Sequence, residues 1–325
     1  MPTLAPQTFD AFVVSAGFLG DTAFFALGDG TVHLIGAQNH VVQAHKGSVL
    51  AACVSRDGRH LVTSGDDGRV MQIGEDGALE CLAERPRKWI DILATGPDGA
   101  VAFASGRTAW TRDRSGAEKE FPMERAVGGL AFAPKGMRLA VARYGGATLF
   151  WVNTAGKPTE LSWAGAHNGI TWSPDGKYVV TTMQENALHG WRLADGQDMR
   201  MTGYPAKIKA TSWSTRGRYL ATSGAGAAIL WPFSGKNGPM GQTPLQLGAM
   251  GEDALVSMVA CHPDEDALAI GYQDGMVLAS RFEDGAERVL RRSGEGPVTT
   301  LSWSQDGMKV AFGTEGGAGG VISLP

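Results

Sequence analysis

Short apolar runs separated by polar turns follow one another along the chain. In the stretch 169–193, an apolar run ends at Trp172, Ser-Pro-Asp-Gly follows at 173–176, and a second apolar run covers 178–182. Proline presets φ at the second position of a turn, and glycine accepts the positive φ that other residues resist. The pattern predicts strand, turn, strand, turn and a third strand that ends near Trp191.

The first of these turns recurs eight times, at intervals of roughly 40 residues, which is the length of one propeller blade. The turns lie at 18–21, 55–58, 96–99, 133–136, 173–176, 214–217, 262–265 and 304–307. Small-residue-rich strands follow each turn, and no segment shows a sustained helical period. The whole chain is therefore expected to be all-β and built from repeats.

A single four-stranded sheet cannot bury both faces, whereas sheets arranged radially cover one another. We therefore expect residues 1–325 to form a single closed β-propeller domain of four-stranded blades. Eight blades are expected, or seven if the first and last units share one. The last unit ends after its third strand, and residues of about 3–9 are expected to supply its fourth.

Several motifs resemble those of the WD40-repeat family of β-propellers. Ala-His pairs precede two first strands, Asp-Asp-Gly occupies one second turn, and tryptophan ends three third strands. In that family, His, Ser or Thr, Asp and Trp form a buried hydrogen-bond network within each blade. The resemblance assigns this structural role to His45, Asp66, His167, Trp151, Trp191 and Trp231.

The motifs also depart from the family pattern. Ile73 stands where the second unit would have Trp, Gln184 stands where the fifth would have Asp, and the Trp-Asp dipeptide is absent. Two other propeller classes share part of the pattern. Six-bladed TolB-like propellers are usually exported, and the third-strand tryptophans favour the WD40 family over them. Eight-bladed quinoprotein dehydrogenases would show recurrent tryptophan-docking motifs and an exported start, and the sequence shows neither.

Composition narrows the partners and the compartment. A net charge of -4 and a pI near 6.0 argue against broad binding to nucleic acid or membranes. Cys53, Cys81 and Cys261 are far apart and odd in number, so neither a disulfide framework nor a paired-cysteine zinc site is expected. Cytoplasmic location is the default, and the Ala- and Gly-rich, Lys-poor composition suggests a bacterial protein.

Catalytic motifs are absent from the sequence. It has no Gly-x-Ser-x-Gly elbow, no phosphate-binding loop and no His-Glu-x-x-His, and its seven histidines show no ligand spacing. No catalytic residue, cofactor or metal ligand is therefore assigned.

Function is expected on the loops that precede the first strands and on the second-to-third-strand turns, where backbone varies without disturbing the sheets. The densest basic and aromatic cluster there is Arg85, Arg87, Lys88 and Trp89, with Arg143 and Tyr144 on the same face. A more acidic part of the face contains Tyr204, Lys207, Glu252, Asp253, Tyr272, Gln273 and Glu315. The alternative interpretation is a solvated loop with Trp89 tucked between blades.

Arginine, tryptophan and tyrosine often dominate interface energy. The sequence therefore favours a monomeric, non-catalytic scaffold that presents its loop face to another protein, an acidic peptide or helix being suited to the basic cluster. The alternative is an enzyme, or a binder of a small ligand or metal, with its site in the axial channel.

Overall fold

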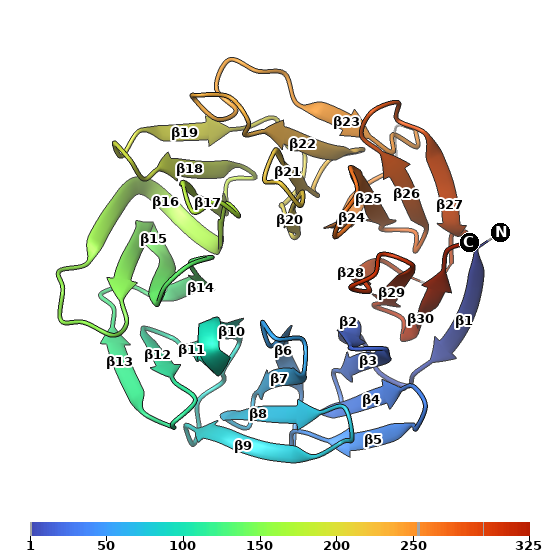
Figure 1. Cartoon of the computed structure of the whole chain (residues 1–325), viewed down its shortest axis with the longest axis horizontal. Helices are drawn as coiled ribbons and strands as arrows, with labels where there is room; N and C mark the ends of the chain where they lie inside the picture. The colour runs from blue at the N-terminus through green and yellow to red at the C-terminus, as the bar shows by residue number, and fades with distance from the viewer. Residues whose placement is uncertain (1, 252–253, 295) are drawn as a thin grey trace. The chain divides into compact units, whose positions relative to one another are not determined.

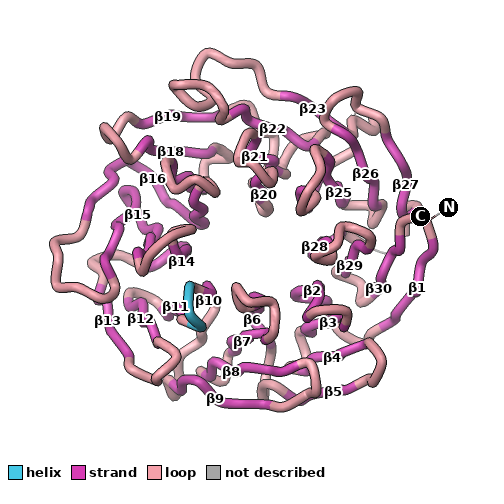
Figure 2. The backbone as a smooth tube through the Cα atoms, viewed as in Figure 1, coloured by secondary structure: helices cyan, strands magenta, loops and turns pink. Residues whose placement is uncertain are grey.

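The computed structural model describes residues 2–251, 254–294 and 296–325, which form strands joined by turns and loops. The helical structure among these residues is one 3-10 turn, η1 (Pro97–Gly99), drawn in cyan in Figure 2. No helix in the described ranges has the length and apolar character that crossing a membrane requires.

The strands of the first half of the chain are β1 (Thr3–Thr8), β2 (Val13–Leu19), β3 (Thr22–Leu27), β4 (Thr31–Ile35), β5 (His40–Gln43), β6 (Val49–Val54), β7 (His60–Gly65), β8 (Arg69–Gly74), β9 (Leu79–Glu84), β10 (Ile92–Thr95), β11 (Val101–Ser105), β12 (Thr108–Arg112), β13 (Glu118–Pro122), β14 (Val127–Phe132), β15 (Arg138–Trp151) and β16 (Thr159–Trp172). Those of the second half are β17 (Tyr178–Met183), β18 (Leu188–Arg192), β19 (Asp198–Met201), β20 (Thr211–Trp213), β21 (Tyr219–Thr222), β22 (Ala228–Pro232), β23 (Leu245–Leu247), β24 (Val256–Cys261), β25 (Ala267–Tyr272), β26 (Val277–Arg281), β27 (Glu287–Arg291), β28 (Val298–Trp303), β29 (Lys309–Thr314) and β30 (Ala318–Ser323).

Within the described ranges, hydrogen bonds join these strands into seven sheets. Six sheets have four strands, in the orders β2-β3-β4-β5, β6-β7-β8-β9, β10-β11-β12-β13, β20-β21-β22-β23, β24-β25-β26-β27 and β1-β30-β29-β28. The seventh runs from β14 to β19 and has six. The count of seven sheets matches the alternative of seven blades rather than the expected eight. The predicted all-β fold is confirmed, and six of these sheets have the predicted four strands.

The six-stranded sheet contains two strands of 14 residues each, β15 and β16. The first part of β15 pairs with β14, and its later part pairs with the beginning of β16. The end of β16, from His167 to Trp172, pairs with β17. Each long strand therefore turns from one neighbour to the next along its length.

The N-terminal strand completes the last sheet, as the sequence predicts. β1 pairs antiparallel with β30, from Thr3 opposite Ser323 to Thr8 opposite Ala318. Beyond the strand, the Phe9 amide donates a hydrogen bond to the Gly317 carbonyl, and the Phe9 ring is buried. The two ends of the chain are thus joined by one ladder (Figure 1).

The chain divides into two compact units, the first of residues 1–27, 33–39 and 203–325, and the second of residues 28–32 and 40–202. In the first unit, β28 lies beside β2 and β24, and β24 lies beside β20. In the second unit, β6, β10, β14 and β16 lie side by side in that order. First strands therefore pack on first strands, the arrangement by which each sheet covers its neighbour. The organisation of residues 1–325 as a single domain stays a prediction.

One hydrogen-bond network of the expected kind lies in the second unit. The buried His45 ring contacts the Asp67 carboxylate at 2.9 Å through Nδ1 and the Thr63 hydroxyl at 2.9 Å through Nε2. A carboxylate only accepts, so Nδ1 carries the proton. The predicted partner, Asp66, is wrong, because its carboxylate accepts instead from the Ser48 amide. Burial raises the pKa of Asp67, but the hydrogen bonds from His45 and the Lys46 amide outweigh it and leave the pKa lowered.

Two further networks replace the missing family residues. His167 donates from Nε2 to the Trp163 carbonyl at 3.1 Å and contacts the Thr181 hydroxyl at 2.7 Å through Nδ1. In the first unit, the Trp231 indole donates to the Tyr204 hydroxyl, which donates to Thr222. Tyr204 therefore holds the position that histidine occupies elsewhere.

Trp191 and Trp151, the other two tryptophans expected in the buried hydrogen-bond networks, differ in their exposure. Trp191 is buried, with its ring centroid 4.7 Å from that of His189. Trp151 is 46% exposed and lies under the Arg138 guanidinium, 5.2 Å from its ring centroid. Trp151 thus covers a cation on the surface rather than joining a buried network.

His189 on β18 is fully buried between two tryptophans. Trp163 stacks on it with ring centroids 4.0 Å apart, and Trp191 meets it edge-on. Neither ring nitrogen has a hydrogen-bond partner among the described residues, and the nearest carboxylate, Asp198, is 3.7 Å away. Burial lowers the pKa of His189 to about 4, although Asp198 opposes the shift.

Deleting residues 2–10 should lower the melting temperature by at least about 5 °C, because it removes the β1 ladder and the buried Phe9 ring. Differential scanning calorimetry measures the shift. If the truncated chain melts at the same temperature as the full-length chain, β1 does not contribute to the stability of the fold.

His189→Phe should reduce the acid sensitivity of the fold. An unfolded histidine takes up a proton below about pH 6.5, whereas the folded one resists down to about pH 4. The free energy of unfolding should therefore be highest above pH 6.5 and fall as the pH drops toward 4, by on the order of 2 kcal/mol from this group. Urea unfolding at pH 7.5 and 4.5 compares the two proteins. Equal losses in both would contradict the assignment.

Candidate functional site

The loops that precede the first strands are hydrogen-bonded to the second-to-third-strand turns of the preceding sheets. The Arg85 amide donates to the Gly68 carbonyl at 2.7 Å, and the Ile90 amide donates to the Gly65 carbonyl at 3.1 Å. Gly68 has φ 79°, and a Cβ there would lie 2.2 Å from the Arg85 carbonyl oxygen. The backbone of this loop is therefore held in place, and only its side chains are left to vary.

Trp89 projects from this fixed loop into solvent. Its side chain is 70% exposed, so the alternative in which it is tucked between blades is wrong. Arg87 and Lys88 beside it are exposed as well, and the Lys88 ammonium lies 5.0 Å from the Trp110 ring centroid. Tyr144, inside β15 at the point where this strand changes from β14 to β16, is 59% exposed.

Two of the predicted binding arginines are engaged within the protein. Arg85 pairs with Glu118, donates to the Glu84 carbonyl at 2.9 Å and lies 5.0 Å from the Trp110 ring centroid. Arg143 pairs with Glu160 and donates to the Thr148 hydroxyl at 3.0 Å. Both guanidiniums are partly buried, so they position the loops and offer little to a partner.

The predicted aromatic part of the face is mostly buried. Tyr204 and Tyr272 are 8% and 2% exposed, and both hydroxyls bond inward, that of Tyr272 to the Gly248 carbonyl. Their predicted role in partner binding is wrong, because a buried tyrosine with a satisfied hydroxyl has no surface to offer. Lys207 is exposed, in the first unit. Glu252 and Asp253 lie outside the described residues.

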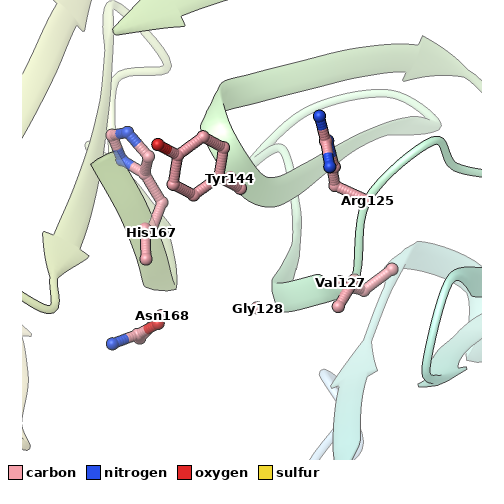
Figure 3. A pocket seen from close by; sticks show the side chains of 8 residues that line it. Arg125, Val127, Gly128, Tyr144, His167 and Asn168 are labelled. Atoms are coloured by element: carbon pink, nitrogen blue, oxygen red, sulfur yellow. The ribbon is translucent and has the colours of Figure 1, made fainter. Parts of the chain in front are cut away.

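A cavity of about 570 Å³ opens beside Tyr144 in the second unit. It is lined by Arg125, Ala126, Val127, Gly128, Tyr144, Ala166, His167 and Asn168. In Figure 3, the Tyr144 hydroxyl points toward the His167 ring, and Arg125 lies on the other side of the tyrosine. The loop carrying Arg125 is fixed like the one before it, by a bond of 2.8 Å from the Val127 amide to the Gly106 carbonyl.

Arg125 is the residue that sequence reasoning missed. It is exposed, and no ion pair of the described residues involves it. Arg125 lies shortly before the first strand of its repeat, as Lys88 does in the repeat before. Comparing equivalent loop positions between repeats would therefore have identified it from the sequence. We call Arg87, Lys88, Trp89, Arg125 and Tyr144 the loop surface.

The described residues contain no cluster of side chains that could bind a metal ion, and the thiols of Cys53 and Cys261 stay protonated. No group of three or more His, Cys, Asp or Glu among the described residues could hold a metal ion. Burial raises the pKa of Cys53 to about 11 and that of Cys261 to about 12, so both thiols stay protonated at neutral pH. The cavity lining itself carries one arginine and no carboxylate.

Comparison with known proteins agrees with the frame motifs. Residues 36–72, which include His45, Asp66 and Asp67, match the family described as "WD domain, G-beta repeat". Telomerase protein component 1 of Rattus norvegicus is 23% identical over 315 residues. The ribosome biogenesis protein WDR12 homolog of Drosophila mojavensis is 26% identical over 131 residues.

The chain covers only part of each relative. The match to the rat protein spans 94% of this chain and 10% of that protein, and the match to the fly protein spans 38% and 30%. Both relatives are animal proteins, so the bacterial origin suggested by composition stays a prediction.

The fold is also found among solved structures. The computationally designed protein Ika8, known from a crystal structure, superposes with a TM-score of 0.78 over 98% of both chains at 18% identity. At that identity the likeness concerns the fold alone. The repeated turns, the His45 network and the matched WD repeat make the chain similar to the WD40-repeat β-propellers.

Proposed function

We propose that this protein is a non-catalytic scaffold that binds another protein through the loop surface of its second unit. The observation that carries the proposal is the exposure of Trp89 on a loop whose backbone is fixed by the frame. Tryptophan is among the residues enriched at binding hot spots, because it offers a large contact area.

The cations around Trp89 favour an acidic segment as the partner. Arg87, Lys88 and Arg125 are exposed and have no ion-pair partner in the described ranges, and Lys46 and Arg107 are exposed on adjoining loops of the same unit. Charged groups at an interface mainly raise the association rate and select the partner. The aromatic side chains would then supply the contact area, and the cations the preference for acidic sequence.

The two relatives fit this role to the extent that their names describe it, one being a component of telomerase and the other a ribosome biogenesis protein. Their names do not identify a partner for this chain. The same fold carries unrelated functions, so the argument rests on the loop surface of this protein and not on the relatives.

The loop surface is tested by affinity capture with purified variants. Two variants are compared with the parent protein: the double variant Arg87→Glu, Lys88→Glu and the single variant Trp89→Ala. Each should bind the partner at least about tenfold more weakly and therefore fail to capture it. Lys135→Glu is the matched control, since it reverses an exposed cation in the first-to-second-strand turn of the same unit. All variants should melt like the parent protein, because the replaced side chains are exposed.

Capture by the parent and the Lys135→Glu control alone, persisting after nuclease treatment and followed by mass spectrometry, would support a protein partner at this surface. Capture that both loop variants retain would overturn the proposal. Loss of the signal on nuclease treatment would point to nucleic acid instead.

We also infer that the six-stranded sheet serves as two blades, which gives eight in all. The eight turn repeats favour this number, as does the way in which β15 and β16 change neighbours at Tyr144 and His167. A crystal structure would decide the matter, since a continuous sheet packed as one blade contradicts the inference.

A further inference from the structure

We propose that the cavity beside Tyr144 is an anchor pocket for one carboxylate side chain of the partner, paired with Arg125. The inference rests on the proposed function and specifies the chemistry that the loop surface recognises. It concerns a side chain of glutamate or aspartate within a peptide, bound without any covalent step.

The cavity lies above a close backbone approach between two neighbouring first strands, β14 and β16. Bulge residues in other first strands are Val14, Leu50, Ser257 and Thr299, and the last two carry a hydroxyl that reaches the next first strand. A bulge near the start of β24 and of β28 leaves Ser257 and Thr299 outside the regular ladder. The Ser257 hydroxyl donates to the Val298 carbonyl at 2.7 Å, and the Thr299 hydroxyl donates to the Val13 carbonyl at 2.7 Å. Each hydroxyl thus ties one first strand to the next.

In β14 the bulge residue is Gly128, which has no hydroxyl to donate. A Cβ at Gly128 would lie 1.9 Å from the His167 carbonyl oxygen, so the two backbones approach too closely for any larger residue. The bulge of β16 places Asn168 opposite, and both bulge residues line the cavity. The two first strands therefore meet here through backbone, and the cavity opens beside their bulge residues.

The charge of the lining comes from one group. Burial lowers the pKa of His167, so its ring is neutral at neutral pH. The Asn168 amide donates to the Gln184 side-chain oxygen at 3.0 Å, which uses part of its hydrogen-bonding capacity within the frame. Arg125 is the remaining charged residue of the lining, and Tyr144 adds a hydroxyl. Outside the lining, Glu185 and Arg143 act on His167 with opposite signs. Arg125 therefore sets the charge of the lining itself, and an anion is the complementary ligand.

The number of donors favours a carboxylate over a phosphate. A single guanidinium can offer two parallel N–H groups to the two oxygens of a carboxylate. A phosphate group carries almost two charges at neutral pH and is usually met by clusters of arginine. The volume of about 570 Å³ leaves room for the methylene groups of a glutamate against the Tyr144 ring.

The test uses three short peptides that differ at one position. Acetyl-Gly-Ala-X-Ala-Gly-amide, with X as glutamate, glutamine or phosphoserine, is titrated into the ¹⁵N-labelled protein at millimolar concentration. The glutamate peptide should shift the backbone amides of Gly128, Tyr144 and Asn168, and the glutamine peptide should leave them in place. Equal shifts with glutamine, tighter binding of phosphoserine, or no shift with any peptide would each overturn the assignment.

Variants separate pairing from general attraction. Arg125→Gln should lower the affinity for the glutamate peptide at least tenfold. Arg125→Lys should restore only part of this affinity, because a lysine cannot form the bidentate hydrogen bonds of a guanidinium. Tyr144→Phe should weaken it severalfold. Arg107→Gln, which removes an exposed cation outside the lining, should change it less than twofold. An equal loss of affinity with Arg107→Gln and Arg125→Gln would show that the peptide is attracted by the general positive charge of the surface. It would contradict specific pairing with Arg125.

The failure of this inference is distinguishable from that of the proposed function. Partner capture that survives Arg125→Gln but is lost with Arg87→Glu and Lys88→Glu would leave the scaffold role intact and remove the anchor pocket. Capture unaffected by either change would remove both.

Discussion

The close approach of neighbouring first strands is the constraint on which the rest of the structure depends. A sheet of this kind has two apolar faces, and only the next sheet can cover them. The approach is so near that a Cβ at Gly128 would lie 1.9 Å from a backbone oxygen, and one at Gly313 would lie 2.3 Å from a Val13 methyl carbon. The small-residue-rich strands and the hydroxyl ties of Ser257 and Thr299 follow from this packing.

The frame also takes up most of the side chains that could perform chemistry. The side chains of His45, His167 and Tyr204 form hydrogen bonds with threonines inside the sheets. Arg85 and Arg143 form ion pairs with Glu118 and Glu160. What remains for a partner is a small set of exposed side chains on loops with fixed backbones. Such a surface is pre-organised, so binding needs little ordering of the loop.

The sequence predicts the frame well because turn chemistry is local. Proline and glycine specify the first turns, and the missing fourth strand of the last unit implies the pairing of β1. It could not separate Asp66 from Asp67, since two adjacent residues of a turn point different ways and only the three-dimensional path decides which meets His45. It misplaced Tyr204 for a related reason: burial depends on Trp231 and Thr222, which are distant in sequence. The repeat that contains Trp231 has no Ala-His pair, which indicated that another residue, Tyr204, would take the place of the histidine.

The central claim is that the partner covers the loops preceding the first strands of the second unit. Hydrogen–deuterium exchange of the purified chain, with and without its captured partner, maps the covered backbone directly. The account predicts slower exchange at 85–91, 123–128 and 143–146, with no change at the opposite turns 133–136 and 173–176. Protection confined to those opposite turns, or to the first unit, would contradict it.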